Sequence, residues 1–204
     1  MDRQKNKYYY LKGIKNGMPI CLGYLAVSFT LGITARNAGM TAWQAMLTSL
    51  ACNASAGQYA GFTVIAAGGT YFEMVLMELV ANARYLLMSC SLSQKFSSET
   101  GLLHRLLVGF DVTDEIFGVA VSEPGKLNPF YNYGMMTVAI PGWSLGTFFG
   151  VIMGNILPAN IVSALSVGLY GMFLAIIIPP ARKNKVIAAL VTISMVSSYI
   201  FSRL

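Results

Sequence analysis

Charged side chains are scarce in this sequence, and their scarcity excludes an ordinary soluble domain. Only 11% of the 204 residues are charged, whereas 55% are hydrophobic. Soluble domains carry about 25% charged residues, so the composition is typical of integral membrane proteins. A chain of this length has room for about seven helical spans (six to eight) of roughly 20 residues each. We therefore predict an all-α polytopic bundle that forms a single transmembrane domain over residues 1–204.

Histidine and cysteine are also rare, which argues against two further kinds of site. Cys21, Cys52 and Cys90 all lie in apolar stretches, so the sequence predicts no disulfide framework. His104 is the only histidine and has no second ligand nearby, so we expect neither a metal site nor a cofactor. A single histidine also rules out the His-Glu-x-x-His motif of metalloproteases, and we expect no catalytic residues.

The positive charges are unevenly spread along the chain. Five of the 14 Lys and Arg residues lie among the first fifteen residues, and three more lie at 182–185. The positive-inside bias of membrane proteins produces such clusters at the ends of apolar runs. We predict a cytoplasmic basic tail at 1–13, no nucleic-acid binding, and a multi-pass protein in the lipid bilayer.

Seven apolar runs predict the spans, and polar residues interrupt two of them. The runs cover about 14–35, 41–67, 71–93, 102–122, 133–157, 159–180 and 186–203. Non-helical backbone at membrane depth is tolerated only inside protein or beside a water-filled cavity, and broken helices form the substrate sites of many transporters. We therefore expect discontinuous or re-entrant helices near 53–58 and 104–115. An N-terminus in the cytoplasm places nine positive residues inside and four outside, which favours that orientation.

Small residues recur at every fourth position in the fifth run, at Gly142, Gly146, Gly150 and Gly154. Such a stripe lets the backbones of two membrane helices approach closely. We interpret it as a packing face rather than as a substrate contact.

Three polar clusters lie inside apolar stretches of membrane length. An ionised side chain at bilayer depth costs at least roughly 2.5–3.5 kcal/mol, so a chain that keeps several of them predicts a path or pocket through the membrane. The candidates for the transport path are Asn53, Ser55, Gly57, Gln58, Asn82 and Arg84, and those for proton coupling or ion pairing are Glu78, Asp111, Asp114 and Glu115.

Helical spacing predicts a contact between the second and third clusters. Glu78 and Asn82 are four residues apart and share a helix face, whereas Arg84 lies six residues past Glu78 and turns away from it. Arg84 needs a partner from another helix, because an unpaired guanidinium in a dry interior is costly. The carboxylates at 111, 114 and 115 have i, i+3 and i+4 spacing and are expected on one helix face. We predict an ion pair between Arg84 and one of them.

Each cluster also has a structural interpretation. Arg84 and the carboxylates form either a group that handles substrate and protons or an ion pair at a helix end. Asn53, Ser55 and Gln58 either hydrogen-bond the charged groups of a zwitterion or bond between helices. The alternatives to a transporter are an intramembrane enzyme that uses the carboxylates as acid and base, and a non-transporting scaffold subunit.

Short motifs follow one another along the chain in a fixed order. They are Gly17-Met-Pro19, Ala56-Gly57-Gln58, Asn82-Ala-Arg84-Tyr85-Leu86-Leu87, Thr113-Asp114-Glu115, Trp143-Ser-Leu-Gly146-Thr147 and Phe173-Leu-Ala-Ile-Ile-Ile-Pro179. Taken together they resemble the AzlC family, the large subunit of bacterial branched-chain amino acid exporters. The Asn-x-Arg-Tyr-Leu and Thr-Asp-Glu motifs are the most specific parts of this resemblance.

The resemblance implies a transporter subunit in the bacterial cytoplasmic membrane that works with a small membrane partner of the AzlD type. It also implies export of branched-chain or related hydrophobic amino acids, driven by the proton gradient. Members of that family usually run longer, so the resemblance leaves room for a final C-terminal span that is absent here.

Overall fold

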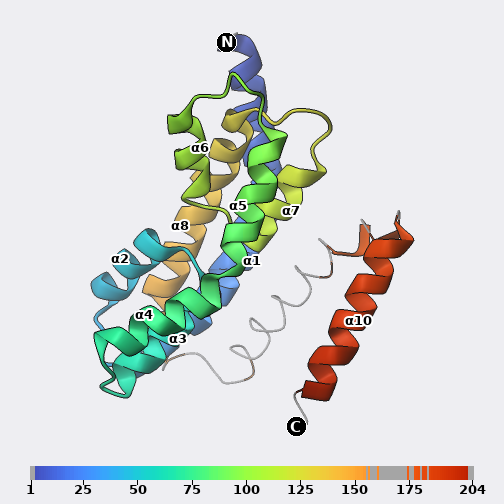
Figure 1. Ribbon diagram of the computed structural model, residues 1–204. Helices are drawn as coiled ribbons and strands as arrows, with labels where there is room; N and C mark the ends of the chain where they lie inside the picture. Colours follow the sequence, from blue (N-terminus) through green and yellow to red (C-terminus); the bar gives the residue numbers. More distant parts are fainter. Residues whose placement is uncertain are drawn as a thin grey trace.

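The computed structural model describes residues 3–154 and 184–201, together with positions 156, 160, 174, 177–179, 181 and 182. Its regular elements over these residues are helices, which agrees with the predicted all-α class. Figure 1 shows the two longest helices, α1 and α8, running side by side. In chain order the helices are α1 (Arg3–Asn37), α2 (Ala42–Cys52), α3 (Ser55–Ala66), α4 (Tyr71–Asn82), α5 (Arg84–Lys95), α6 (Leu102–Gly109), α7 (Asp114–Ser122), α8 (Pro129–Met153) and α10 (Lys185–Phe201).

Two of these helices, α1 and α8, are long and apolar enough to cross a membrane. The pair α4 and α5 qualifies as a third span with a bend of 44° between its halves. The expected number of about seven spans is not confirmed, because the runs at 41–67 and 102–122 each divide into two short helices. Most of the run at 159–180 lies outside the described residues. Helix α1 begins at Arg3, so the stretch expected as a tail at 1–13 is helical from that residue.

Glycines allow α1 and α8 to approach each other closely. A Cβ atom on Gly32 would lie 2.8 Å from Cα of Gly150, and one on Gly150 would lie 2.9 Å from Cα of Gly32. Gly13 and Gly134 oppose each other in the same way, with corresponding distances of 3.0 and 2.9 Å. The two backbones can therefore pack here only because both helices lack a side chain at the contact. The interpretation of the glycine stripe as a packing face is confirmed.

Replacing Gly150 by alanine is expected to destabilise the protein by about 1–3 kcal/mol, because the added methyl group forces the two backbones apart. Gly109→Ala in α6 is the matched control, since a Cβ atom there would meet nothing within 4 Å. Unfolding of the purified proteins in detergent measures both effects. Equal stability of the two variants would contradict the packing argument.

The first two polar clusters coincide with breaks between short helices. Helix α2 ends at Asn53, whose left-handed backbone (φ 41°) turns the chain into α3. Asparagine tolerates this conformation better than other residues with a side chain. Helix α4 gives way to α5 at Ala83, in the middle of the second cluster. The discontinuity expected near 53–58 is confirmed, whereas the break at Ala83 was not predicted.

The third cluster coincides with the break between α6 and α7, which confirms the discontinuity expected near 104–115. Helix α7 begins at Asp114, after Thr113 caps it by accepting a hydrogen bond from the amide of Ile116 at 3.3 Å. Asp111 precedes this cap and lies outside the helix. The expectation that Asp111, Asp114 and Glu115 share one helix face is therefore wrong, because the helix on which it relied starts only at Asp114.

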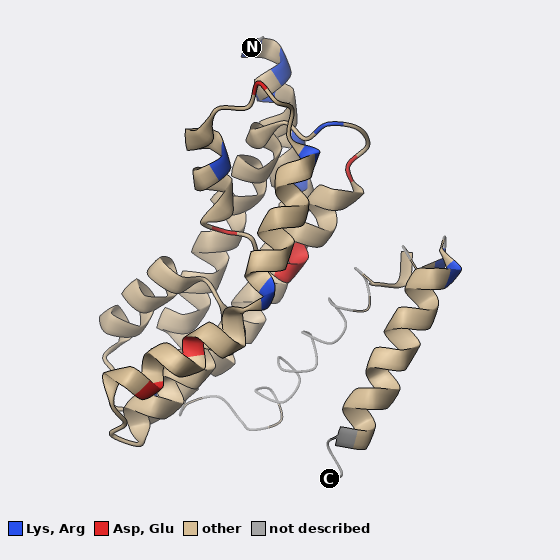
Figure 2. Ribbon diagram, viewed as in Figure 1, with Lys and Arg blue, Asp and Glu red and all other residues tan. Residues whose placement is uncertain are grey.

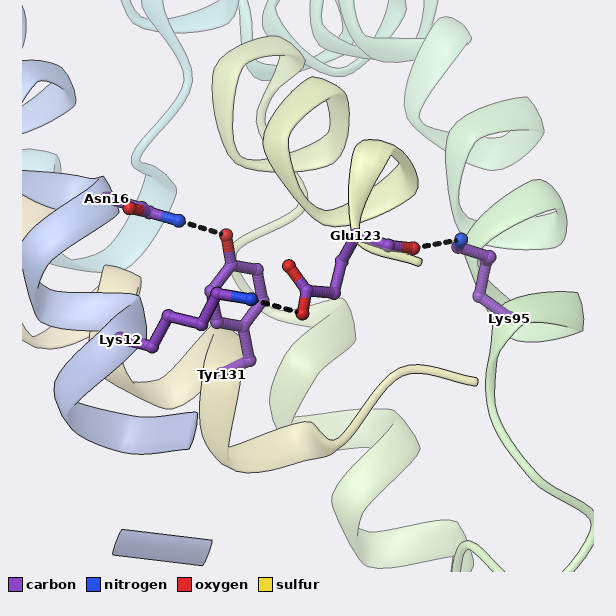
Figure 3. Close-up of polar contacts among 5 residues, drawn as sticks. All are labelled: Lys12, Asn16, Lys95, Glu123 and Tyr131. Atoms are coloured by element: carbon purple, nitrogen blue, oxygen red, sulfur yellow. Dashed lines mark hydrogen bonds and ion pairs between the residues drawn. The ribbon is translucent and has the colours of Figure 1, made fainter. Parts of the chain in front are cut away.

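The basic end of α1 is tied to the loop that follows α7. Figure 2 shows that Lys and Arg gather at the end of the bundle where the N-terminus lies. Lys12 Nζ pairs with Glu123 Oε1 at 2.5 Å, and Lys95 Nζ donates to the main-chain oxygen of Glu123 at 2.6 Å (Figure 3). Asn16 Nδ2 donates to the Tyr131 hydroxyl at 2.7 Å (Figure 3). The Asn16–Tyr131 bond thus connects α1 to α8, and the contacts of Glu123 connect α1 to the C-terminal ends of α5 and α7.

Candidate functional site

Arg84 and Asp114 form an ion pair across two helix breaks. They are the first residues of α5 and α7, and Arg84 Nη2 lies 3.0 Å from Asp114 Oδ2. The predicted contact between Arg84 and a carboxylate is therefore present. Their side chains are 45% and 31% exposed, and the guanidinium lies over the Tyr85 ring at 5.3 Å from its centroid. Each partner retains hydrogen-bonding capacity for a further polar group.

Asp111 bonds to Asn53, so the third cluster also reaches the first. The side-chain amide of Asn53 donates to Asp111 Oδ1, and the two residues are only 5% and 1% exposed. Asn53 Oδ1 and Asp111 Oδ2 have no hydrogen-bond partner among the described residues. Because buried polar atoms normally find a partner, these two oxygens are available to a proton, a water molecule or a ligand.

Glu115 contacts α1 through Tyr24. The Tyr24 hydroxyl donates to Glu115 Oε2 at 2.6 Å and lies 2.6 Å from Thr113 Oγ1. All three residues are buried. The Tyr24 ring in turn packs edge-on against Trp143 of α8, with ring centroids 5.2 Å apart. The three carboxylates of the third cluster thus contact three different residues. Asp111 contacts Asn53 at the break after α2, Asp114 contacts Arg84 of α5, and Glu115 contacts Tyr24 of α1.

Gln58 is enclosed by hydrogen bonds that join α2, α3 and α8. Its Nε2 donates to Ser49 Oγ at 2.9 Å, and its Oε1 accepts a bond from Trp143 Nε1 at 2.6 Å. Ser49 Oγ lies 2.7 Å from Thr147 Oγ1, which donates to the main-chain oxygen of Trp143 at 3.2 Å. Gln58 is 2% exposed, and both ends of its amide are occupied. This geometry favours the structural interpretation of Gln58.

Glu78 and Asn82 share one face of α4, as their spacing predicts. Asn82 Nδ2 donates to Glu78 Oε2 at 2.7 Å. This polar face meets α3 at Gly57, where a Cβ atom would lie 2.7 Å from Asn82 Nδ2. Gly57 therefore lets the polar face of α4 approach α3 closely. Ser55, at the start of α3, is exposed and lines the largest of the cavities described next.

Three adjoining cavities connect the polar clusters, and we call them together the polar cleft. The largest, of about 470 Å³, has two kinds of wall. Arg84 and Ser55 supply polar groups, whereas Val27, Leu31 and Trp143 supply apolar surface. An amphipathic small molecule needs both kinds of surface at once.

The other two cavities of the polar cleft lie deeper. The middle one, of about 10 Å³, is lined by Asp114 and Glu115 and shares Ser55 and Trp143 with the largest cavity. It has room for about one water molecule. The third, of about 60 Å³, is lined by Asn53 and Asp111, among others, and shares Asn53 with the middle cavity. The cleft thus narrows at Asp114 and Glu115 in this conformation.

The middle cavity is also lined by four residues with polar side-chain atoms that were not predicted as site residues: Tyr24, Tyr85, Thr113 and Trp143. Tyr85 and Thr113 adjoin Arg84 and Asp114 in the chain, and that adjacency was the available signal. Tyr24 and Trp143 lie in apolar runs, where their largely apolar rings do not stand out as polar residues in the sequence. Their role depends on which helices pack together, so spacing within one segment could not indicate it.

The sequence Gly142-Trp-Ser144-Leu-Gly146 has the spacing of a hydrolase nucleophile motif, but its structure does not fit that chemistry. It lies within α8, whereas the nucleophile of such enzymes sits on a strand-to-helix turn. Ser144 is 3% exposed and donates to the main-chain oxygen of Ile140 at 2.9 Å.

His104, the single histidine, contacts an aromatic residue of α8: its Nδ1 lies 2.8 Å from the Tyr133 hydroxyl. In the part of the chain that the structure describes, no group of three or more His, Cys, Asp and Glu residues could hold a metal ion.

Long apolar helices around a polar cleft built from broken helices define an integral membrane protein. The family model of the AzlC protein matches residues 19–157, more than half of the chain. This chain belongs to the AzlC family. The matched range contains all three polar clusters, so the resemblance carried by the short motifs is confirmed.

Individual relatives are also membrane proteins. An uncharacterized membrane protein of Archaeoglobus fulgidus is 30% identical over 182 residues, which cover 88% of this chain and 80% of the relative. The inner membrane protein YgaZ of Escherichia coli is 26% identical, over 72% of this chain and 61% of its own length. An uncharacterized membrane protein of Helicobacter pylori is 25% identical, over 72% of this chain and 66% of its own. No solved structure matches the chain.

Gln58→Leu is expected to lower the free energy of unfolding by about 1–3 kcal/mol, because it leaves the buried Trp143 indole without a partner. It also removes one of the two side-chain contacts of the Ser49 hydroxyl, which keeps its bond to Thr147. Gln94→Leu is the matched control, since Gln94 is exposed near the end of α5. Unfolding in detergent compares the two. Unchanged stability of Gln58→Leu would contradict the structural interpretation of Gln58.

Proposed function

We propose that this chain is the large subunit of a transporter that exports branched-chain or related hydrophobic amino acids. In this proposal a small membrane partner of the AzlD type completes the transporter, and the proton gradient drives it. Membership of the AzlC family supports the proposal. The observation that carries it is the Arg84–Asp114 pair, in which Arg84 lines a cavity that also has apolar surface from Val27, Leu31 and Trp143.

The polar cleft has the groups that an amino acid zwitterion requires. The guanidinium of Arg84 can bind a carboxylate through two parallel hydrogen bonds. Asp114 and Glu115, which line the adjoining narrow cavity, can accept hydrogen bonds from an ammonium group. Val27, Leu31 and Trp143 offer apolar surface to a branched side chain. A hydrophobic amino acid therefore matches the cleft better than a sugar or an inorganic ion does.

Asp111 is the best-placed residue for proton coupling. It is buried, it accepts one hydrogen bond from Asn53, and its Oδ2 has no partner among the described residues. A proton can bind that oxygen without breaking an existing hydrogen bond. Glu115 differs, because Tyr24 already bonds to it. Binding of a proton at Asp111 would change the charge at the break between α6 and α7, next to the narrow part of the cleft.

The cytoplasmic membrane and an inside N-terminus complete the proposal. The Escherichia coli relative is named an inner membrane protein, which supports this location. The basic residues of α1 gather at one end of the bundle (Figure 2), and such clusters favour the cytoplasmic side. The proposal of a small partner subunit is supported only by membership of the AzlC family.

Export is tested in cells that lack the gene and are fed dipeptides. Restoring the chain together with its small membrane partner should lower intracellular valine, isoleucine, leucine or methionine. Arg84→Gln should reduce this export about tenfold or more, because a charge-assisted contact to the substrate is lost. Accumulated amino acids are measured by mass spectrometry of cell extracts.

Arg182→Gln is the control for that experiment, since Arg182 is an exposed residue outside the cleft. It should leave export unchanged. An absence of any change in amino acid levels when the chain and its partner are restored would overturn the exporter. A scaffold subunit would instead give export that does not depend on Arg84.

Proton coupling is tested by amide substitutions in the third cluster. Asp111→Asn should leave amino acid efflux down its own gradient but remove its stimulation by a pH gradient, because an amide cannot take up the proton. Asp114→Asn and Glu115→Gln complete the series. Glu73→Gln is the control, since Glu73 caps its own helix at Thr70. Unchanged pH dependence in all three variants would refute coupling through this cluster.

A further inference from the structure

A second cavity lies apart from the polar cleft, between the first turns of α1 and the start of α8. Its volume is about 740 Å³. Arg3, Lys7 and Tyr10 line it from α1, and Phe130 and Tyr133 line it from α8. The three α1 residues have i, i+4 and i+7 spacing and therefore share one helix face. We call this space the basic cavity.

Among the described residues, no carboxylate neutralises the cations of the basic cavity. Helix α1 contains no acidic residue. The ion pairs among the described residues are Lys12–Glu123 and Arg84–Asp114, so neither Arg3 nor Lys7 has a carboxylate partner there. Lys12, five residues beyond Lys7, differs because its ammonium group forms an ion pair with Glu123 (Figure 3). Two exposed cations beside a cavity leave a site for an anion.

Aromatic residues form the other side of the basic cavity. Phe130 and Tyr133 pack edge-on, with ring centroids 5.4 Å apart. His104 of α6 holds the Tyr133 hydroxyl at 2.8 Å, and the Tyr10 hydroxyl lies 3.0 Å from Thr137 Oγ1. Tyrosines with an apolar ring and a bonded hydroxyl are enriched where a membrane meets water. The cavity therefore combines cations and aromatic rings at the end of the two longest apolar helices.

We propose that the basic cavity binds the headgroup of an anionic phospholipid. Arg3 and Lys7 bind the phosphate oxygens, and Phe130 contacts the glycerol and the start of an acyl chain. Basic pockets between membrane helices on the cytoplasmic side bind lipid headgroups in this way. The argument is independent of the polar cleft, since no residue lines both cavities. A lipid held here bridges α1 and α8, the two helices whose glycine contact frames the bundle.

The full chain in nanodiscs tests this site. Discs of phosphatidylcholine alone are compared with discs that also contain phosphatidylglycerol, and with phosphatidylcholine discs in phosphate buffer. Bound phosphatidylglycerol is counted by native mass spectrometry, and unfolding temperature is recorded in parallel. We expect phosphatidylglycerol to remain bound and to raise the unfolding temperature, and inorganic phosphate to have neither effect.

The variant pair R3Q/K7Q removes both cations of the basic cavity and should weaken phosphatidylglycerol binding about 30-fold. The control pair K5Q/K15Q removes the same charge from exposed positions of α1 that do not line the cavity, and it should keep the wild-type affinity. Equal weakening in both pairs would overturn the site in favour of diffuse surface attraction. Inorganic phosphate as effective as phosphatidylglycerol would overturn the assignment to a lipid.

Discussion

Broken backbone and ionised side chains inside a membrane protein must find their hydrogen-bond partners within the protein, and this requirement brings the helix breaks together. The break after α6 contributes Asp111, which accepts a bond from Asn53 at the break after α2. The first residue of α7, Asp114, pairs with Arg84, the first residue of α5. Each break alone would leave a buried polar group at a cost of several kcal/mol. Joined in this way, they form the lining of a cleft.

The polar cleft has one continuous wall and one segmented wall. Tyr24 and Val27 come from α1 and Trp143 from α8, the two long helices locked by opposing glycines. The other wall comes from α3, α5 and α7, each no longer than 12 residues and each beginning at a break. The architecture thus places Arg84 and Asp114 at the first residues of short helices, whereas α1 and α8 pack backbone to backbone.

The sequence allowed prediction of local features better than of their arrangement. The spacing of Glu78 and Asn82 correctly gave their shared face, because both lie on α4, whereas Arg84 begins α5 after a break that the spacing did not reveal. The same reasoning failed for Asp111, because Thr113 restarts the helix and removes the register on which the i, i+3 and i+4 pattern relied. Spacing could not decide between the substrate-binding and the structural interpretation of Gln58 either, since its partners Ser49 and Trp143 come from other helices. The predicted number of about seven spans is not confirmed for a related reason: apolar composition does not reveal where a helix breaks.

The cations illustrate why composition alone underdetermines function. A net charge of +6 and a basic N-terminus predict orientation, yet the individual charges have different surroundings. Lys12 is held by Glu123, and Arg84 by Asp114, so both pairs are locally neutral. Arg3 and Lys7 face a cavity without a carboxylate partner among the described residues. A cation without a partner can bind an external anion without giving up an existing contact. The basic cluster from which the orientation is predicted therefore contains Arg3 and Lys7, the two cations to which we assign the lipid headgroup.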